Sequence, residues 1–146
     1  MQYKWVASRL QELEVACREN RLPVTAQRRM IFEELLARDD HPTADQIYEA
    51  VRTRMPQLSR TTIYRTLDTF VELGVIRRVA HAGGARYDAN TARHHHLVCS
   101  ACGKMADVLE PSLDQLTLRK GKRLGFRIDD YSVHFTGICA DCQSHS

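Results

Sequence analysis

Two pairs of cysteines, each with two residues between its members, constrain this chain more than any other feature. The pairs are Cys99 with Cys102, and Cys139 with Cys142 near the end of the sequence. Two thiolates at this spacing can bind one Zn²⁺ at about 2.3 Å, and two pairs complete a tetrahedral site. The gap of residues 103–138 exceeds the roughly 15–20 residues of a usual zinc ribbon. We therefore predict a structural zinc ion that fastens the ends of a small folded unit together.

The alternatives are two disulfides or four unrelated thiols. Residues 1–10 carry Lys4 and Arg9 but no apolar run, so they do not resemble a signal peptide. We expect a cytoplasmic protein in a reducing compartment, where disulfides are disfavoured. Cys17 lies in a stretch with helical periodicity, and we expect it to be a small core residue.

Composition sets limits but does not identify a function. A chain of 146 residues with 43% hydrophobic content can bury one medium core or two small ones. No apolar run reaches the length of a membrane span, so we expect no membrane association. The net charge of +3 is mildly basic and does not by itself indicate nucleic-acid binding.

Residues 1–90 are predicted to form four helices and a hairpin. The first helix covers residues 5–19, where apolar positions are spaced by three and four. The next three helices have cap residues, and glycine ends the last of them. The caps are Thr25, Thr43 (in a capping box with Gln46) and Ser59, and the final stop is Gly74.

The fourth helix has a buried stripe and a polar face. The expected stripe is Ile63, Leu67, Phe70 and Val71. The polar side chains of its first two turns can contact phosphates and base edges, as a recognition helix does. These candidate DNA-binding residues are Ser59, Arg60, Thr61, Tyr64 and Arg65. A solvated helix face is the plain alternative.

A two-stranded ribbon is predicted after the fourth helix. Residues 75–79 and 85–87 flank a turn at Gly83 and Gly84, which is typical of a hairpin. Arg77, Arg78 and Arg86 are available for the phosphate backbone. Helices followed by such a hairpin indicate a winged helix-turn-helix domain, and this order favours DNA binding.

Residues 91–146 are predicted to form a small α/β domain, which makes the fold class α+β. We expect strands at 97–99 and 105–109, a helix after Pro111 with a basic end at 119–123, and a strand at 126–138. Gly125 ends the expected helix. About 50 residues are marginal alone, so zinc and a second copy pairing at an exposed sheet edge are plausible supports.

Histidines and aspartates gather where the two parts of the chain meet. His94 and His96 lie two apart, so on a strand both face one side and His95 faces the other. Three imidazoles and two carboxylates suit Mn²⁺ or Fe²⁺. The candidate ligands are His41, Asp88, His94, His96 and Asp107. A solvated strand edge is the alternative.

Four motifs together resemble the ferric uptake regulator (Fur) family over nearly the whole chain. They occupy residues 41–48 (HPTADQIY), 59–67 (SRTTIYRTL), 94–103 (HHHLVCSACG) and 139–142. The resemblance implies a homodimeric bacterial repressor with a winged helix, a dimerisation domain, a structural Cys₄ zinc and a regulatory metal at the hinge. Its partner would be a double-stranded, palindromic DNA operator.

Within the family, the all-aspartate ligand set resembles the peroxide-sensing PerR branch. That branch implies Fe²⁺-catalysed oxidation of a ligand, here His41 or His94, while Mn²⁺ supports DNA binding without this chemistry. The alternative is a Fur-like repressor that responds to iron, manganese or zinc without peroxide chemistry. The family's other metal site is in doubt, because Arg93 and Tyr131 stand where ligands are expected beside His95 and Asp114.

A zinc-dependent hydrolase is the alternative from another functional class. The sequence has no His-Glu-x-x-His pair and no nucleophile beside a base. We therefore expect no enzyme and no small-molecule substrate other than peroxide. We expect His81 and His134 to be ordinary surface or strand residues.

Overall fold

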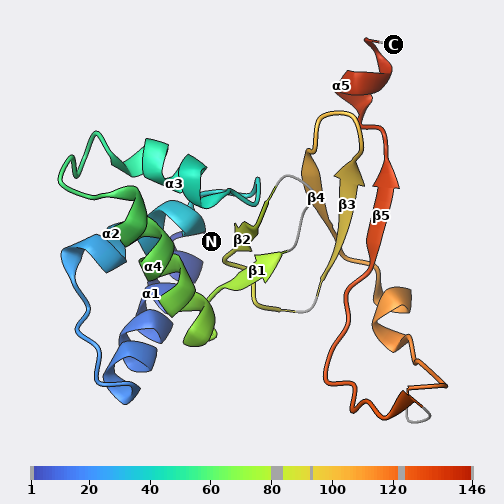
Figure 1. Cartoon of the computed structure of the whole chain (residues 1–146), viewed down its shortest axis with the longest axis horizontal. Coiled ribbons are helices and arrows are strands. Elements are labelled where there is room, and N and C mark those ends of the chain that lie inside the picture. The colour runs from blue at the N-terminus through green and yellow to red at the C-terminus, as the bar shows by residue number, and fades with distance from the viewer. Residues whose placement is uncertain (1, 80–83, 93, 122–123, 146) are drawn as a thin grey trace. The chain divides into compact units, whose positions relative to one another are not determined.

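The computed structural model describes residues 2–79, 84–92, 94–121 and 124–145, and it divides into two compact units, residues 1–91 and 92–146 (Figure 1). The first unit contains four helices and a two-stranded ribbon: α1 (Gln2–Glu19), α2 (Ala26–Leu36), α3 (Ala44–Val51), α4 (Arg60–Glu72), β1 (Arg77–Val79) and β2 (Arg86–Asp88). The fold is mixed α+β, as predicted. Among the described residues, no helix is both long and apolar enough to cross a membrane.

The predicted caps of α2, α3 and α4 and the glycine stop after α4 are confirmed, whereas α1 begins at Gln2, before the predicted start at residue 5. The Thr25 hydroxyl accepts a hydrogen bond from the backbone of Arg28. Thr43 and Gln46 form the reciprocal capping box, and the Ser59 hydroxyl accepts from the backbone of Thr62. Gly74 has φ of +74°, which only glycine adopts readily. These caps satisfy N–H groups that a helix start leaves without partners.

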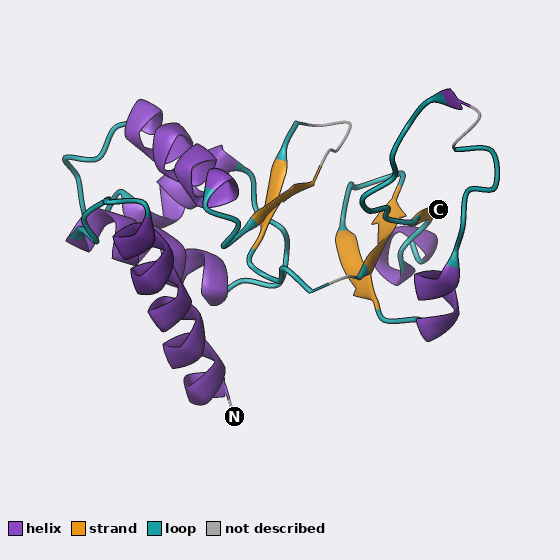
Figure 2. Cartoon of the chain, turned by 90° about the horizontal axis from the view of Figure 1, so that it is seen from below, coloured by secondary structure: helices purple, strands orange, loops and turns teal. Residues whose placement is uncertain are grey.

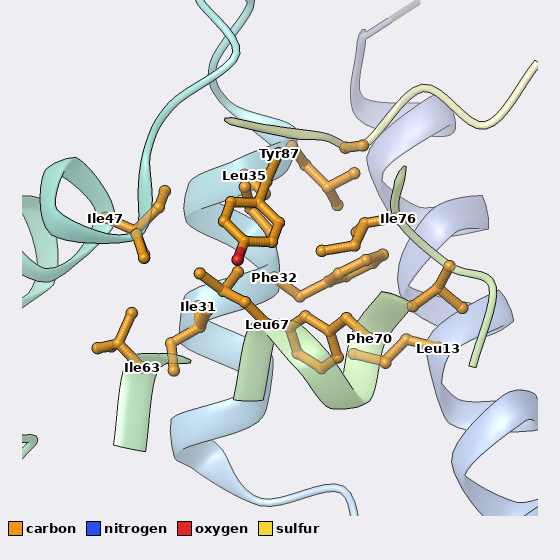
Figure 3. Packing of buried hydrophobic residues seen from close by; sticks show 14 of the residues in the cluster. Leu13, Ile31, Phe32, Leu35, Ile47, Ile63, Leu67, Phe70, Ile76 and Tyr87 are labelled. Atoms are coloured by element: carbon orange, nitrogen blue, oxygen red, sulfur yellow. The ribbon is translucent and has the colours of Figure 1, made fainter. Parts of the chain in front are cut away.

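One hydrophobic core joins the four helices to the ribbon (Figure 3). Phe32 of α2 meets Phe70 of α4 edge to face, with ring centroids 5.4 Å apart. Ile76 and Tyr87 cover the core from the ribbon side. The predicted α4 stripe is buried at three of its four positions, while Val71 is only partly buried. Phe32 is fully buried although the sequence analysis did not single it out.

The ribbon is antiparallel, with Arg77 opposite Asp88 and Arg78 opposite Tyr87. Gly84 has φ of +115°, which fits a glycine turn. Gly83 of the predicted turn and His81, which was expected to have no special role, lie outside the described residues.

The second unit is built on a three-stranded sheet in the order β4-β3-β5. Strand β3 (His95–Cys99) pairs antiparallel with β4 (Met105–Val108) and parallel with β5 (His134–Gly137). A 3₁₀ turn, η1 (Pro111–Gln115), follows β4, and a short helix, α5 (Ala140–Gln143), follows β5. Loops form most of the described chain between η1 and β5 (Figure 2).

Two predictions for the second unit are wrong in this structure. The expected helix after Pro111 is only the 3₁₀ turn η1, and the chain is extended at Leu116. Leu116 and Leu118 are 51% and 64% exposed, so this segment buries no apolar face in a single chain, and a short helix without such packing is marginal. The expected strand 126–138 is paired only over β5. Residues 122–123 of the predicted basic end lie outside the described residues.

Phe70→Ala tests the core of the first unit. Because Phe70 is fully buried against Phe32, the change should lower the free energy of unfolding by about 3–5 kcal/mol. Urea denaturation followed by circular dichroism measures the change. Val24→Ala is the control, because Val24 is 40% exposed and should change stability by no more than about 0.5 kcal/mol. Equal effects of the two changes would contradict this description of the core.

Candidate metal centres and nucleic-acid interface

The four cysteines of the two pairs converge at one end of the second unit. Cys99 ends β3, and Cys102 lies in the turn before β4. Cys139 directly precedes α5, and Cys142 lies within it. The turn is held by hydrogen bonds from Cys99 N to the Lys104 oxygen at 2.8 Å and from Gly103 N to the Cys99 oxygen at 2.9 Å. The four sulfur atoms lie within 4.8 Å of one another. Segments far apart in sequence therefore present one group of thiols.

The sulfur geometry fits zinc and not disulfides. All four thiols are free, and the Cys102 and Cys139 sulfurs are 3.8 Å apart. A disulfide requires about 2.05 Å, whereas four sulfurs at about 2.3 Å from a tetrahedral zinc are separated by about 3.8 Å. The cluster is thus a Cys₄ site for a structural zinc ion.

Backbone N–H groups prepare this cluster for a cation. The backbone N–H groups of Cys139 and Cys102 point at the Cys99 sulfur and lower its pKa to about 6. Hydrogen bonds with the Cys139 and Cys102 sulfurs raise the pKa of Cys142 to about 12. Without metal, Cys99 therefore loses its proton more readily than Cys142 does. A dication that displaces these protons removes the repulsion between neighbouring thiolates.

His41 and Asp88 form a pair in the first unit. The Nε2 atom of His41 lies 3.1 Å from Oδ2 of Asp88, and Oδ1 of Asp88 accepts a hydrogen bond from Asn90 N at 2.8 Å. The asparagine bond orients the carboxylate so that its other oxygen faces the imidazole. A neutral imidazole and an oriented carboxylate are ligands that Mn²⁺ and Fe²⁺ accept.

The backbone of His41 is in an uncommon conformation. Its φ is +51°, in the left-handed region that costs a non-glycine residue of order 1–3 kcal/mol. Two residues of β2 hold this segment in place. Tyr87 N donates to the Pro42 oxygen at 2.9 Å, and Arg86 donates to the His41 oxygen at 3.2 Å. Strand β2 therefore fixes the segment that carries His41.

His94, His96 and Asp107 form a second group, within the second unit. His96 and Asp107 are cross-strand partners on β3 and β4. Oδ1 of Asp107 lies 3.4 Å from Nε2 of His94 and 3.7 Å from Nε2 of His96. The ring centroids of the two histidines are 4.7 Å apart, as expected for residues two apart on a strand. Nδ1 of His94 is 2.7 Å from the Ala92 oxygen, so a proton on Nδ1 leaves Nε2 as the ligand atom.

His95 faces a different environment from its two neighbours. Its Nδ1 accepts a hydrogen bond from Val133 N at 3.0 Å, and its Nε2 lies 2.9 Å from Oδ1 of Asp114. The side chain of Tyr131 stacks on the ring at a centroid distance of 6.0 Å. Because both ring nitrogens are engaged within the protein, His95 is a structural histidine in this arrangement.

Helix α4 presents part of the expected DNA-binding face to solvent. Thr61, Tyr64 and Arg65 are exposed. Arg60 is also exposed, but it donates to Asp45 at 2.6 Å and lies over the Tyr48 ring at 4.5 Å. The Ser59 hydroxyl caps the helix. A DNA contact by Arg60 would therefore replace its ion pair with Asp45 of α3. Sequence reasoning missed this ion pair because the two residues lie fifteen positions apart.

The two arginines of β1 differ in their surroundings. Arg78 is exposed, bonded to the Asp68 carboxylate, and close to the Tyr87 ring at 5.9 Å. Interactions with Tyr87 and Asp68 raise its pKa above the usual arginine value, so it stays charged. Arg77 is half-buried at the start of the strand. Only Arg78 is therefore well exposed on the described part of β1.

Comparisons with known proteins agree on one family. The model described as "Ferric uptake regulator family" matches residues 19–136. A peroxide-responsive repressor PerR of Staphylococcus saprophyticus is 32% identical over 139 residues, which is 94% of each chain. The ferric uptake regulator Fur of Helicobacter pylori superposes with a TM-score of 0.77 at 22% identity, over 94% of this chain and 93% of that chain. A zinc-bound manganese uptake regulator gives 0.67 at 29% identity, over 87% and 98%.

Cys102→Ser tests the zinc site. Loss of one thiolate leaves a site with three sulfurs, so the purified protein should retain little zinc after dialysis against a weak chelator. Elemental analysis gives the zinc content per chain. Cys17→Ala is the matched control, because Cys17 is a buried thiol of the first unit and its loss should leave one zinc per chain. Equal zinc retention in the parent and Cys102→Ser proteins would exclude the site.

Proposed function

Because this chain belongs to the ferric uptake regulator family, we propose that its metal-dependent repression of transcription is controlled by Fe²⁺ or Mn²⁺ and relieved by peroxide. Members of the family are metal-responsive regulators that bind DNA as dimers, and they are not enzymes. The observation that carries the proposal is the pair of His/Asp groups, one in each unit, whose donor types suit the same metals.

We assign the regulatory metal to five residues, two from the first unit and three from the second: His41, Asp88, His94, His96 and Asp107. Within each unit the imidazole and carboxylate atoms already lie 3.1–3.7 Å apart. Bringing like-charged carboxylates together without a cation is unfavourable, so a bound dication favours the joined arrangement of the units. The metal then acts as a ligand that selects one conformation.

The DNA contacts are assigned to α4 and the ribbon. Thr61, Tyr64 and Arg65 are exposed on the first turns of α4, where a recognition helix reads base edges. Ser59, Arg60, Arg77 and Arg78 complete the proposed DNA-binding set. Two such units in a dimer would bind a palindromic operator, because a two-fold protein recognises two-fold DNA.

The dimer contact is assigned to the second unit. Several of its apolar side chains are exposed in the single chain, and Leu109, Leu118 and Phe126 are 79%, 64% and 71% exposed. So much apolar surface is unfavourable in water and marks an interaction site. A second copy that covers the segment after η1 would supply the packing that a helix there needs.

Peroxide sensing is assigned to the five-residue site. These residues would hold Fe²⁺, which would supply the electrons for peroxide reduction beside its imidazole ligands, whereas Mn²⁺ would not supply this chemistry. In the net reaction, hydrogen peroxide gives one oxygen atom to a carbon of an imidazole ring and leaves as water. Oxidation of His41 or His94 removes a neutral nitrogen donor, so the joined arrangement loses its metal and the protein releases DNA.

His96→Ala tests the role of the metal in DNA binding. Loss of the His96 imidazole should weaken Mn²⁺-dependent DNA binding strongly. Removing a residue that only hydrogen-bonds a metal ligand costs roughly 10–100-fold, and removing a ligand itself should cost more. Gel-shift titrations with Mn²⁺ and with chelator measure this. His134→Ala is the control, because its ring lies 4.9 Å from that of His96 but is outside the proposed site. A His96→Ala protein that retains parental Mn²⁺ dependence would disprove the assignment.

Peroxide treatment of the iron-loaded protein tests the sensing mechanism. One oxygen atom should be added to a peptide that contains His41 or His94, and DNA binding should fall in parallel. Tandem mass spectrometry locates the oxygen atom. The manganese-loaded protein is the control and should remain unmodified. If chelation releases DNA but peroxide neither modifies these histidines nor releases DNA, the protein is an iron-responsive repressor without peroxide chemistry.

A further inference from the structure

A polar cleft separates the start of α2 from α4 in the first unit. Its volume is about 310 Å³, and it is lined by Pro23, Thr25, Gln27, Arg28, Thr62, Arg65, Thr66 and Thr69. Apart from Pro23, every lining residue carries a hydroxyl, an amide or a guanidinium group. Arg65 belongs to the DNA-binding set proposed above. The opposite wall, from α2 and the preceding loop, has no assigned role.

The charge of the cleft is positive and uncompensated. None of the lining residues is acidic, and in the described part of the chain neither Arg28 nor Arg65 forms an ion pair with a carboxylate. Other arginines of this unit are neutralised: Arg60 by Asp45, Arg78 by Asp68, and Arg29 by Glu33. The field near the cleft therefore favours an anion.

Arg28 is held in place before any ligand arrives. Its backbone N–H donates to the Thr25 hydroxyl at 3.2 Å, and its Nη1 donates to the Pro23 oxygen at 2.6 Å. A guanidinium has five N–H donors, so the remaining donors can serve a ligand. Such fixing lowers the entropy lost when the side chain binds an anion.

We propose that Arg28 binds a phosphate of the DNA backbone in this cleft, beside the bases contacted by the first turns of α4. Gln27 and Thr62 border the same space and can donate to the phosphate oxygens. Such contacts fix the register of a protein on DNA without reading its sequence. The inference rests on the proposed DNA-binding function and adds the start of α2 to the interface.

The test compares Arg28→Gln with Arg29→Gln. Each change removes one positive charge from the same turn of α2, but the Arg29 guanidinium bonds Glu33 at 3.0 Å and approaches Glu14 at 3.9 Å. The probe is a short duplex selected from a random pool by the manganese-loaded parent protein, together with a scrambled duplex. Binding constants are measured for both duplexes over a series of salt concentrations.

Arg28→Gln should reduce the magnitude of the slope of log K against log salt by about 0.9 per protomer, or about 2 per dimer. Its preference for the selected over the scrambled duplex should stay at the parental value. Arg28→Lys, which keeps the charge, should retain most of the slope, and Arg29→Gln should match the parent. Thermal unfolding of each variant confirms that the first unit is folded.

Two results would overturn the inference. A slope for Arg28→Gln equal to that of the parent would exclude a phosphate contact. A slope that is unchanged while the preference for the selected duplex falls would assign Arg28 to base reading. Failure of the parent itself to select any duplex with Mn²⁺ is a different result, because it would contradict the proposed function on which the inference rests.

Discussion

The second unit depends on its four thiols, because it has little else to hold it together. Among its described residues, the buried apolar side chains are Cys99 and Met105, and the other buried side chains are His94, His95 and His96. A unit with so small a core cannot offset the conformational entropy of ordering its loops. A zinc ion supplies this stabilisation directly, because its binding free energy is folding free energy. The cysteines are therefore part of the fold as well as a metal site.

The same sheet that leads into the thiols also positions the histidines. Strand β3 carries His96 toward Asp107 of β4 and His95 toward Asp114 and Val133. Alternation along the strand thus separates a proposed metal ligand, His96, from a structural histidine, His95. Because β3 runs from His95 to Cys99, the zinc cluster and one proposed regulatory ligand, His96, share this strand. Loss of zinc would disturb both.

The first unit shows how a chain of modest net charge can still carry a local positive field at its proposed DNA-binding face. Carboxylates of α3 and α4 neutralise Arg60 and Arg78, whereas Arg28 and Arg65 remain beside a cleft without acidic residues. Phosphate binding depends on such local fields more than on the total charge of the chain. The strained backbone of His41, which β2 holds in place, puts one proposed metal ligand in the same unit as the proposed DNA-binding face.

The sequence alone determined the features that depend on short-range patterns. The caps at Thr25, Thr43 and Ser59, the stop at Gly74, the ribbon and the paired thiols follow from local geometry, since each involves residues a few positions apart. The resemblance carried by four motifs identified the family. Only tertiary structure decided what depends on contacts distant in sequence: the ion pair of Arg60 with Asp45, the bonds that engage His95, and the cleft at Arg28. It also decided that the segment after Pro111 forms only a 3₁₀ turn, because helical periodicity cannot show whether a partner surface is present to bury the apolar face.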